Sequence, residues 1–391
     1  MSPARRARRR RVLTWTAAVG VPVLAGAAIL VPMAASGAVD LPDKTPAELI
    51  EFAAASDVDA LSGTIEQSSD LGLPDLGALT GAMGDSSASE GGPTAADIDD
   101  LISLVTGSHT AKVYLDGESA RMQVLDQLGE RNVYVDGVAN QIWYVDSETQ
   151  TATQLMLPSD AEIDGLHSDA SVPQEAVPTP DEMLDQALAG LDESTEVTVG
   201  TDARVAGRDV YELVLTPRTA DTLVGEIRFA IDGENGVALA ASVTARGASE
   251  PAFQTGFTQV DFSAPEPAVF AFTPGDGITV TQKDIALPDG APSHDSAPTD
   301  DATSDAASPV VYGEGWSVVV ELPNSSEAGA ADVFAGLDPE QLALLNSVTT
   351  AVDGGRVLQT SLVSVLITDD GRVLAGAVPA ARLVEAAQTG R

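Results

Sequence analysis

Cysteine is absent from the sequence, and this absence excludes several kinds of chemistry at once. Without a thiol the chain can form no disulfide, thiolate metal site, cysteine nucleophile or lipidated anchor. Histidine is nearly as scarce, because only His109, His167 and His294 occur, and none has a neighbour at the spacing of metal ligands. We therefore expect no metal site and interpret the three histidines as structural or incidental.

Basic residues are also few, since 20 Lys and Arg stand against 59 Asp and Glu and the formal net charge is -39. Lysine occurs only at Lys44, Lys112 and Lys283, and six arginines crowd between Arg5 and Arg11. A surface of this charge repels phosphate backbones and anionic lipid head groups. We therefore exclude nucleic acid as a partner.

The motifs of common enzyme classes are missing as well. The sequence has no Gly-x-Ser-x-Gly elbow, no phosphate-binding loop and no dinucleotide fingerprint at a strand–helix junction. The acidic run at Asp300 and Asp301 lacks the glycine and the terminal glutamate of a calcium loop. A pair of carboxylates acting as general acid and base stays open as an alternative, because 59 acidic residues are present. We expect a protein that is not an enzyme and needs no cofactor.

The N-terminus has the three parts of a secretory signal. The arginine cluster is followed by an uncharged apolar stretch from Val12 to Met33 and then by small residues up to Ala38. We predict that residues 1–38 are a signal peptide cleaved after Ala38. An uncleaved membrane anchor is the alternative, because the stretch is long enough to span a bilayer. Both interpretations place the rest of the chain outside the cytoplasm.

Beyond this segment, the 44% of hydrophobic residues is enough for a sizeable core. Residues 283–308 are rich in Asp, Pro, Ser and Ala and cannot bury enough surface to fold, so they are predicted as a disordered acidic linker. The linker separates a main domain, residues 39–282, from a small α/β C-terminal domain, residues 309–391.

Two helices are marked by their first residues. The sequences Thr45-Pro46-Ala47-Glu48 and Thr179-Pro180-Asp181-Glu182 each combine a capping threonine, a proline at the first helical position and a glutamate that completes a capping box. Apolar residues follow at helical spacing in both segments. Each helix is predicted to precede a set of strands.

Runs of alternating apolar and polar residues between turn signals predict β-hairpins. In the main domain the predicted strands are 61–67, 110–115, 120–125, 132–135, 141–145, 151–157, 196–202, 209–216, 222–231, 237–245, 252–262 and 269–273. In the C-terminal domain we predict strands at 310–322, 356–368 and 372–378 and helices at 332–346 and 380–387. Asp116-Gly117 and Asp136-Gly137 are strong signals for tight turns.

The apolar phase of these strands defines a candidate ligand-binding surface. Residues in that phase share one side of a sheet, because successive side chains point to opposite faces. The predicted cavity residues are Val113, Met122, Val124, Leu213, Leu223, Ile227, Phe229 and Val243. A closed core filled with side chains is the alternative interpretation. An apolar flap within residues 69–108 is predicted to cover the surface, and its lid residues are Leu71, Leu73, Leu76, Leu101 and Leu104.

Several stretches carry a resemblance to a known family. They are Asp59-Ala60-Leu61-Ser62-Gly63-Thr64-Ile65-Glu66, Asp70-Leu71-Gly72-Leu73-Pro74, Gly107-Ser108-His109-Thr110 and the stretch from Ala206 to Pro217. They resemble the LolA-like proteins of actinobacteria, in the superfamily of the lipoprotein carrier LolA, the sigma-factor regulator RseB and mycobacterial lipid-binding lipoproteins. The resemblance covers roughly residues 40–282.

The resemblance implies a fold that is mainly β with helices: an open antiparallel β-half-barrel with a helical lid and an apolar cavity that accepts acyl chains. It implies an extracytoplasmic carrier or sensor that binds a lipid or an acylated lipoprotein. The alternative is an envelope regulatory module that binds a membrane protein or an anti-sigma-type partner.

Overall fold

The computed structural model describes residues 41–72, 108–125, 129–156, 179–284, 310–322 and 348–389. Several predictions lie outside these residues. They are the signal segment 1–38, the lid residues Leu73, Leu76, Leu101 and Leu104, the helix at 332–346 and most of the linker.

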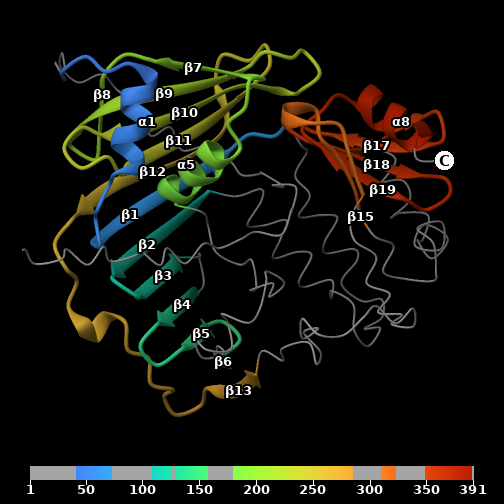
Figure 1. Cartoon of the computed structure of the whole chain (residues 1–391). Helices are drawn as coiled ribbons and strands as arrows, with labels where there is room; N and C mark the ends of the chain where they lie inside the picture. The colour runs from blue at the N-terminus through green and yellow to red at the C-terminus, as the bar shows by residue number, and fades with distance from the viewer. Residues whose placement is uncertain are drawn as a thin grey trace, which may run out of the picture.

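Thirteen strands form one large open sheet (Figure 1). They are β1 (Ala60–Ser69), β2 (His109–Asp116), β3 (Ser119–Leu125), β4 (Glu130–Asp136), β5 (Gln141–Asp146), β6 (Thr151–Met156), β7 (Thr195–Val199), β8 (Ala203–Val205), β9 (Arg208–Pro217), β10 (Val224–Asp232), β11 (Ala238–Ala245), β12 (Pro251–Asp261) and β13 (Thr279–Asp284). The order is β13-β6-β5-β4-β3-β2-β1-β12-β11-β10-β9-β7, and β8 pairs with β9. All neighbours are antiparallel except β13 and β6. The predicted class, a mainly β open half-barrel with helices, is confirmed.

The two capped helices form where the sequence predicts them. They are α1 (Pro46–Ala54) and α5 (Pro180–Ala189), and both capping boxes are complete. Each helix buries a leucine, Leu49 or Leu184, against the same part of the large sheet. The main contacts of α1 are with β7 and β9, and those of α5 are with β11. Both helices therefore lie on one face of the sheet.

A second, six-stranded sheet forms the C-terminal unit. Its elements are β14 (Val310–Tyr312), β15 (Val319–Leu322), β16 (Thr350–Val352), β17 (Gly355–Gln359), β18 (Ser364–Thr368), β19 (Val373–Gly376) and α8 (Ala380–Thr389). The strand order is β14-β15-β19-β18-β17-β16. A buried core of Val319, Leu366, Leu374 and Leu383 joins α8 to this sheet. The unit thus combines a small sheet with a packed helix.

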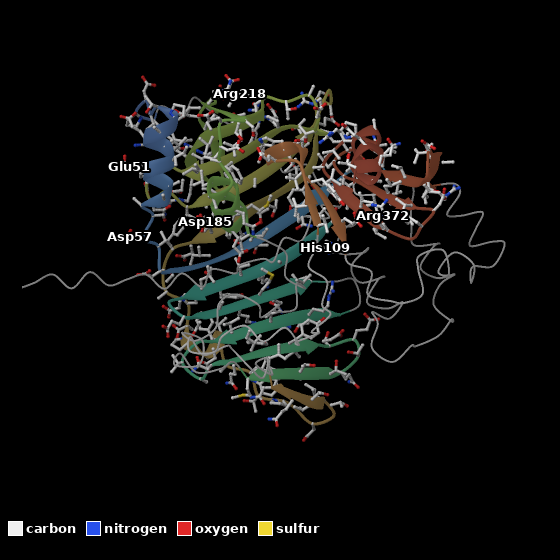
Figure 2. The ribbon with its side chains drawn as sticks, turned by 45° about the vertical axis from the view of Figure 1, so that its right-hand side comes forward. Glu51, Asp57, His109, Asp185, Arg218 and Arg372 are labelled. Carbon is white, nitrogen blue, oxygen red and sulfur yellow. The ribbon has the colours of Figure 1, made fainter. Side chains whose placement is uncertain are left out.

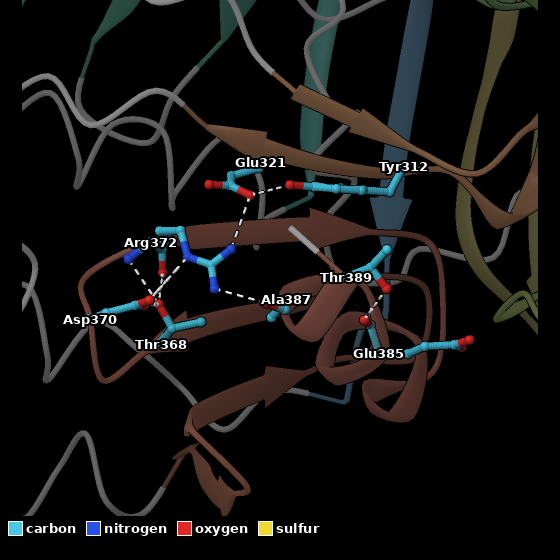
Figure 3. Close-up of polar contacts among 8 residues, drawn as sticks. All are labelled: Tyr312, Glu321, Thr368, Asp370, Arg372, Glu385, Ala387 and Thr389. Atoms are coloured by element: carbon cyan, nitrogen blue, oxygen red, sulfur yellow. Dashed lines mark hydrogen bonds and ion pairs between the residues drawn. The ribbon is translucent and has the colours of Figure 1, made fainter. Parts of the chain in front are cut away.

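Arg372 ties several elements of this unit together (Figure 3). Its Nη2 donates to the carbonyl oxygen of Ala387 in α8 at 2.8 Å, and its Nη1 lies 3.4 Å from Glu321 Oε2 in β15. The hydroxyl of Tyr312 in β14 donates to the same Glu321 oxygen at 2.7 Å. One arginine, directly before β19, thus links this part of the chain to α8 and β15, and through Glu321 to β14.

The structure corrects three predicted strands. No strand forms at 269–273, where a short 3-10 helix, η1 (Pro267–Val269), precedes extended chain. The predicted strand 310–322 is interrupted by a second 3-10 helix, η2 (Gly315–Ser317), next to Gly313 at φ 82°. The predicted strand 356–368 divides into β17 and β18. Alternation alone does not show these breaks, although Gly313 and Gly315 are present at the second one.

Three strands were not predicted: β8, β13 and β16. β8 and β16 are only three residues long. β13 runs to Asp284, two residues past the predicted end of the main domain. Its pairing partner β6 is more than a hundred residues away in the sequence, with Thr279 opposite Thr151. Strands that are very short, or that pair with a distant segment, are difficult to predict from the alternation of neighbouring residues.

Candidate binding face

The strand register shows which predicted cavity residues share a face. Cross-strand partners point to the same side of a sheet. Phe229 is opposite Leu213, and Ile227 is opposite Val243. Val243 is opposite Phe253, and from β12 the same side continues through β1 to Val113, Met122 and Val124. Seven of the eight predicted residues therefore lie on the face that carries α1 and α5, which we call the helix-side face.

Leu223 is the exception, because a β-bulge shifts the register of β10 between Val224 and Glu226. Val224, not Leu223, joins the buried cluster that contains Val243. The backbone N–H of Leu223 donates to the carbonyl oxygen of Ala377 in the C-terminal unit at 2.8 Å. The bulge reverses the alternation at this end of the strand, so the predicted phase holds only from Ile227 onward.

The half of the face beneath the helices is a filled core. Leu213 is 0% exposed and Phe229 is 1% exposed, and both pack with Leu49 of α1 and Leu184 of α5. Figure 2 shows α1 and α5, which carry the labelled residues Glu51 and Asp185, on the same side of the sheet. At these two predicted positions the side chains fill a core, as in the alternative interpretation.

The other half of the face, on β2 to β6, is mainly apolar and partly exposed, and Arg131 and Tyr144 lie in the same phase. Alternate residues here continue the phase of Val113 through the β2–β6 register. We call this set the open half: Val113, Leu115, Met122, Val124, Val133, Val135, Ile142 and Leu155. Leu115 is 39% exposed and Met122, Val133 and Leu155 are half-buried, whereas the other four members are buried. Among the described elements, the helix contacts are concentrated on β7, β9 and β11 instead.

Leu71 is the one predicted lid residue that the structure describes. It is 6% exposed and packs with Val243 and Phe253 of the large sheet and with Leu362 of the C-terminal unit. Its carbonyl oxygen accepts a hydrogen bond from the backbone N–H of Ser361 at 3.0 Å. Leu71 therefore lies at the junction of the two units.

A row of buried polar side chains crosses the helix-side face at β12, β1 and β2. Thr255 is opposite Gln67, and Gln67 is opposite His109. All three are less than a tenth exposed. Gln67 and Thr255 are not among the site residues predicted from the sequence. The alternation of β1 does indicate that Gln67 faces the same side as Leu61 and Ile65, because the three residues are in phase in that strand.

Charged groups on the opposite face form pairs that stabilise the sheet. Arg228 contacts Glu212 at 2.6 Å and Glu226 at 2.7 Å, and Arg208 contacts the buried Asp232. Burial raises the pKa of Glu212, while Arg228 lowers it. Within the described residues there is no group of three or more His, Cys, Asp or Glu placed to hold a metal ion. The carboxylates of Glu212, Glu226 and Asp232 are therefore paired with arginines of the same sheet.

Asp181 is the carboxylate with the strongest perturbation near the helix-side face. It stands in the first turn of α5, and its Oδ1 accepts a hydrogen bond from the backbone N–H of Ala238 in β11 at 3.0 Å. The pKa of Asp181 is raised to about 6, mainly by burial; the Ala238 hydrogen bond opposes this rise and the charges of Asp185 and Glu182 add to it. The carboxylate joins α5 to the sheet.

No protein-family model matches the chain, and no curated protein matches it significantly. Solved structures with a similar arrangement include the MucA/MucB complex of Pseudomonas aeruginosa, at 15% identity and TM-score 0.39, covering 86% of this chain and 93% of that one. Another is an uncharacterized conserved protein of Thermus thermophilus, at 9% identity and TM-score 0.32, covering 61% of this chain and 98% of that one. A third is a LolA superfamily protein of Nitrosomonas europaea, at 10% identity and TM-score 0.24, covering 59% of this chain and 99% of that one. Among the described residues, no helix has the length and hydrophobicity needed to cross a bilayer.

Proposed function

We propose that this chain is a non-enzymatic carrier or sensor that binds a lipid or an acylated lipoprotein on the open half of the helix-side face. The observation that carries the proposal is the partly exposed apolar surface of Leu115, Met122, Val133 and Leu155, which continues the face of the packed core. An acyl chain laid on such a surface gains about 0.8 kcal/mol for each buried methylene. Few polar contacts are then needed for binding.

We further propose that binding takes place outside the cytoplasm. The support is the arginine cluster followed by the uncharged stretch from Val12 to Met33, which has the pattern of an export signal or an anchor. The strongly acidic composition fits a ligand held through its apolar chain, because anionic head groups are repelled by the rest of the surface.

Met122→Glu tests the proposed ligand face. Met122 is half-buried in the centre of the open half, so a carboxylate there keeps contact with water and the fold survives. We expect binding of a fluorescent fatty acid, measured by titration, to weaken at least about tenfold, because the acyl chain would pack against a charge. Phe229 is unsuitable for this test, because it lies in the filled core.

Lys112→Glu is the matched control. Lys112 is exposed on β2 and lies in the opposite phase to Val113, so the same carboxylate is introduced on the other face of the sheet. Its binding should equal that of the wild type. A folded Met122→Glu protein that binds the probe as well as the control would contradict the assignment of the ligand face.

A further inference from the structure

Two buried polar atoms on adjacent strands lack a hydrogen-bond partner. They are Gln67 Oε1 on β1 and Thr255 Oγ1 on β12, in residues that are 5% and 2% exposed. Among the described residues only two other buried side-chain atoms lack a partner, Ser364 Oγ and Arg382 Nε, and both belong to the C-terminal unit. Gln67 and Thr255 are direct cross-strand partners, so their Cβ atoms are about 5 Å apart.

The rows on either side of this pair are mainly apolar, while the buried His109 lies opposite Gln67 in the same row and the buried Ser69 lies opposite Phe253. The next row on the same face holds Ile65 opposite Phe257, and the row on the other side holds Phe253 opposite Val243. An unpartnered polar atom in such surroundings loses its water without compensation, and native proteins rarely keep one. Two such atoms side by side, between rows that hold Ile65, Phe257, Phe253 and Val243, indicate a place where a ligand completes the hydrogen bonding.

We propose that Gln67 and Thr255 bind the polar end of an acyl ligand, and that this end is an amide. The inference rests on the proposed function, because the acyl chain would lie on the apolar face beside the pair. Gln67 Oε1 is an acceptor only, so the ligand must supply an N–H or O–H. The Thr255 hydroxyl can donate to a carbonyl oxygen. An acyl amide carries this donor and this acceptor on adjacent groups, whereas an acyl ester lacks the donor.

The test compares the binding of lauramide and methyl laurate to the full chain by isothermal titration calorimetry. Both probes carry the same acyl chain, and only lauramide has an N–H. We expect the wild type to prefer lauramide about fivefold to tenfold, the effect of one net hydrogen bond. Thr255→Val and Gln67→Met should abolish this preference and leave the affinity for methyl laurate unchanged. Ser364→Ala, which removes another unpartnered buried hydroxyl, should keep the preference.

The outcomes separate this inference from the proposed function. Equal binding of both probes by the wild type overturns the amide site and leaves the ligand face intact, and this result needs no variant to fold. Binding of neither probe overturns both. A preference that persists in Thr255→Val and Gln67→Met also overturns the site. An N-lauroyl glycyl peptide, titrated in parallel, identifies the source of the amide: tighter binding than lauramide supports an acylated protein, and weaker binding supports a free lipid amide.

Discussion

Asp181 joins the first turn of α5 to β11 through a carboxylate with a raised pKa. Its half-buried carboxylate lies between α5 and β11 and accepts the N–H of Ala238. Burial raises its pKa to about 6, above the value near 4 expected in the unfolded chain. The folded state therefore binds the proton more tightly. The associated stabilisation is complete below about pH 4 and is lost as the pH rises through about 6.

Asp181→Asn should therefore stabilise the protein at pH 7. Asparagine keeps an oxygen that can accept from Ala238 and removes the buried charge. We expect the free energy of unfolding in urea to rise by roughly 1–3 kcal/mol at pH 7. The difference from wild type should disappear near pH 4, where Asp181 is protonated. Glu51→Gln, at an exposed position of α1, should show no such pH-dependent gain. A gain that is equal at both pH values would refute this account.

At the scale of the element, α5 depends on its first turn. The Thr179 hydroxyl accepts from the N–H of Glu182 at 3.3 Å, and the Glu182 carboxylate accepts from the N–H of Thr179 at 2.8 Å. Because α5 buries Leu184 in the core, fraying of this turn also loosens the packing on the sheet. The cap thus contributes to global as well as local stability.

Thr179→Ala should lower the free energy of unfolding by about 1 kcal/mol, the usual effect of losing a capping oxygen. Thr179→Ser is the control, because serine keeps that oxygen. Urea denaturation of the two variants measures the difference. Equal destabilisation by serine and alanine would mean that packing of the threonine methyl group, and not the cap, is responsible.

At the scale of the whole molecule, the two units meet through an apolar contact. Leu362 and Val363 pack with Leu71, Val224 and Phe253. Hydrogen bonds flank this contact, including one from Trp316 Nε1 to Thr195 Oγ1 at 2.8 Å. The two units are therefore joined by direct contacts as well as by the chain between them. That residues 283–308 form a linker between two domains stays a prediction.

Cleavage at a protease site inserted within residues 290–300 should leave the two fragments associated on size-exclusion chromatography. Leu362→Asp should separate them, because Leu362 is 1% exposed and its carboxylate would be buried in the junction. Val310→Asp, a similar change at a residue that is 50% exposed in the same unit, should leave them together. Separation of the wild-type fragments after cleavage would show that the junction is too weak to hold them.

Local chemistry alone determined much of this protein. Capping boxes, Asp-Gly turns and period-two alternation act within a few residues. The helices α1 and α5 and most strands of the large sheet could therefore be predicted. The shared face of Val113, Met122 and Phe229 could be predicted for the same reason. Tertiary structure decided the rest. The bulge between β10 and β11, which puts Val224 and not Leu223 in the buried cluster, follows from the register of a whole hairpin. The pairing of β1 with β12, which places Gln67 beside Thr255, joins strands far apart in the sequence. Such pairings are selected by the total surface that the folded sheet buries, and no local sequence pattern contains that information.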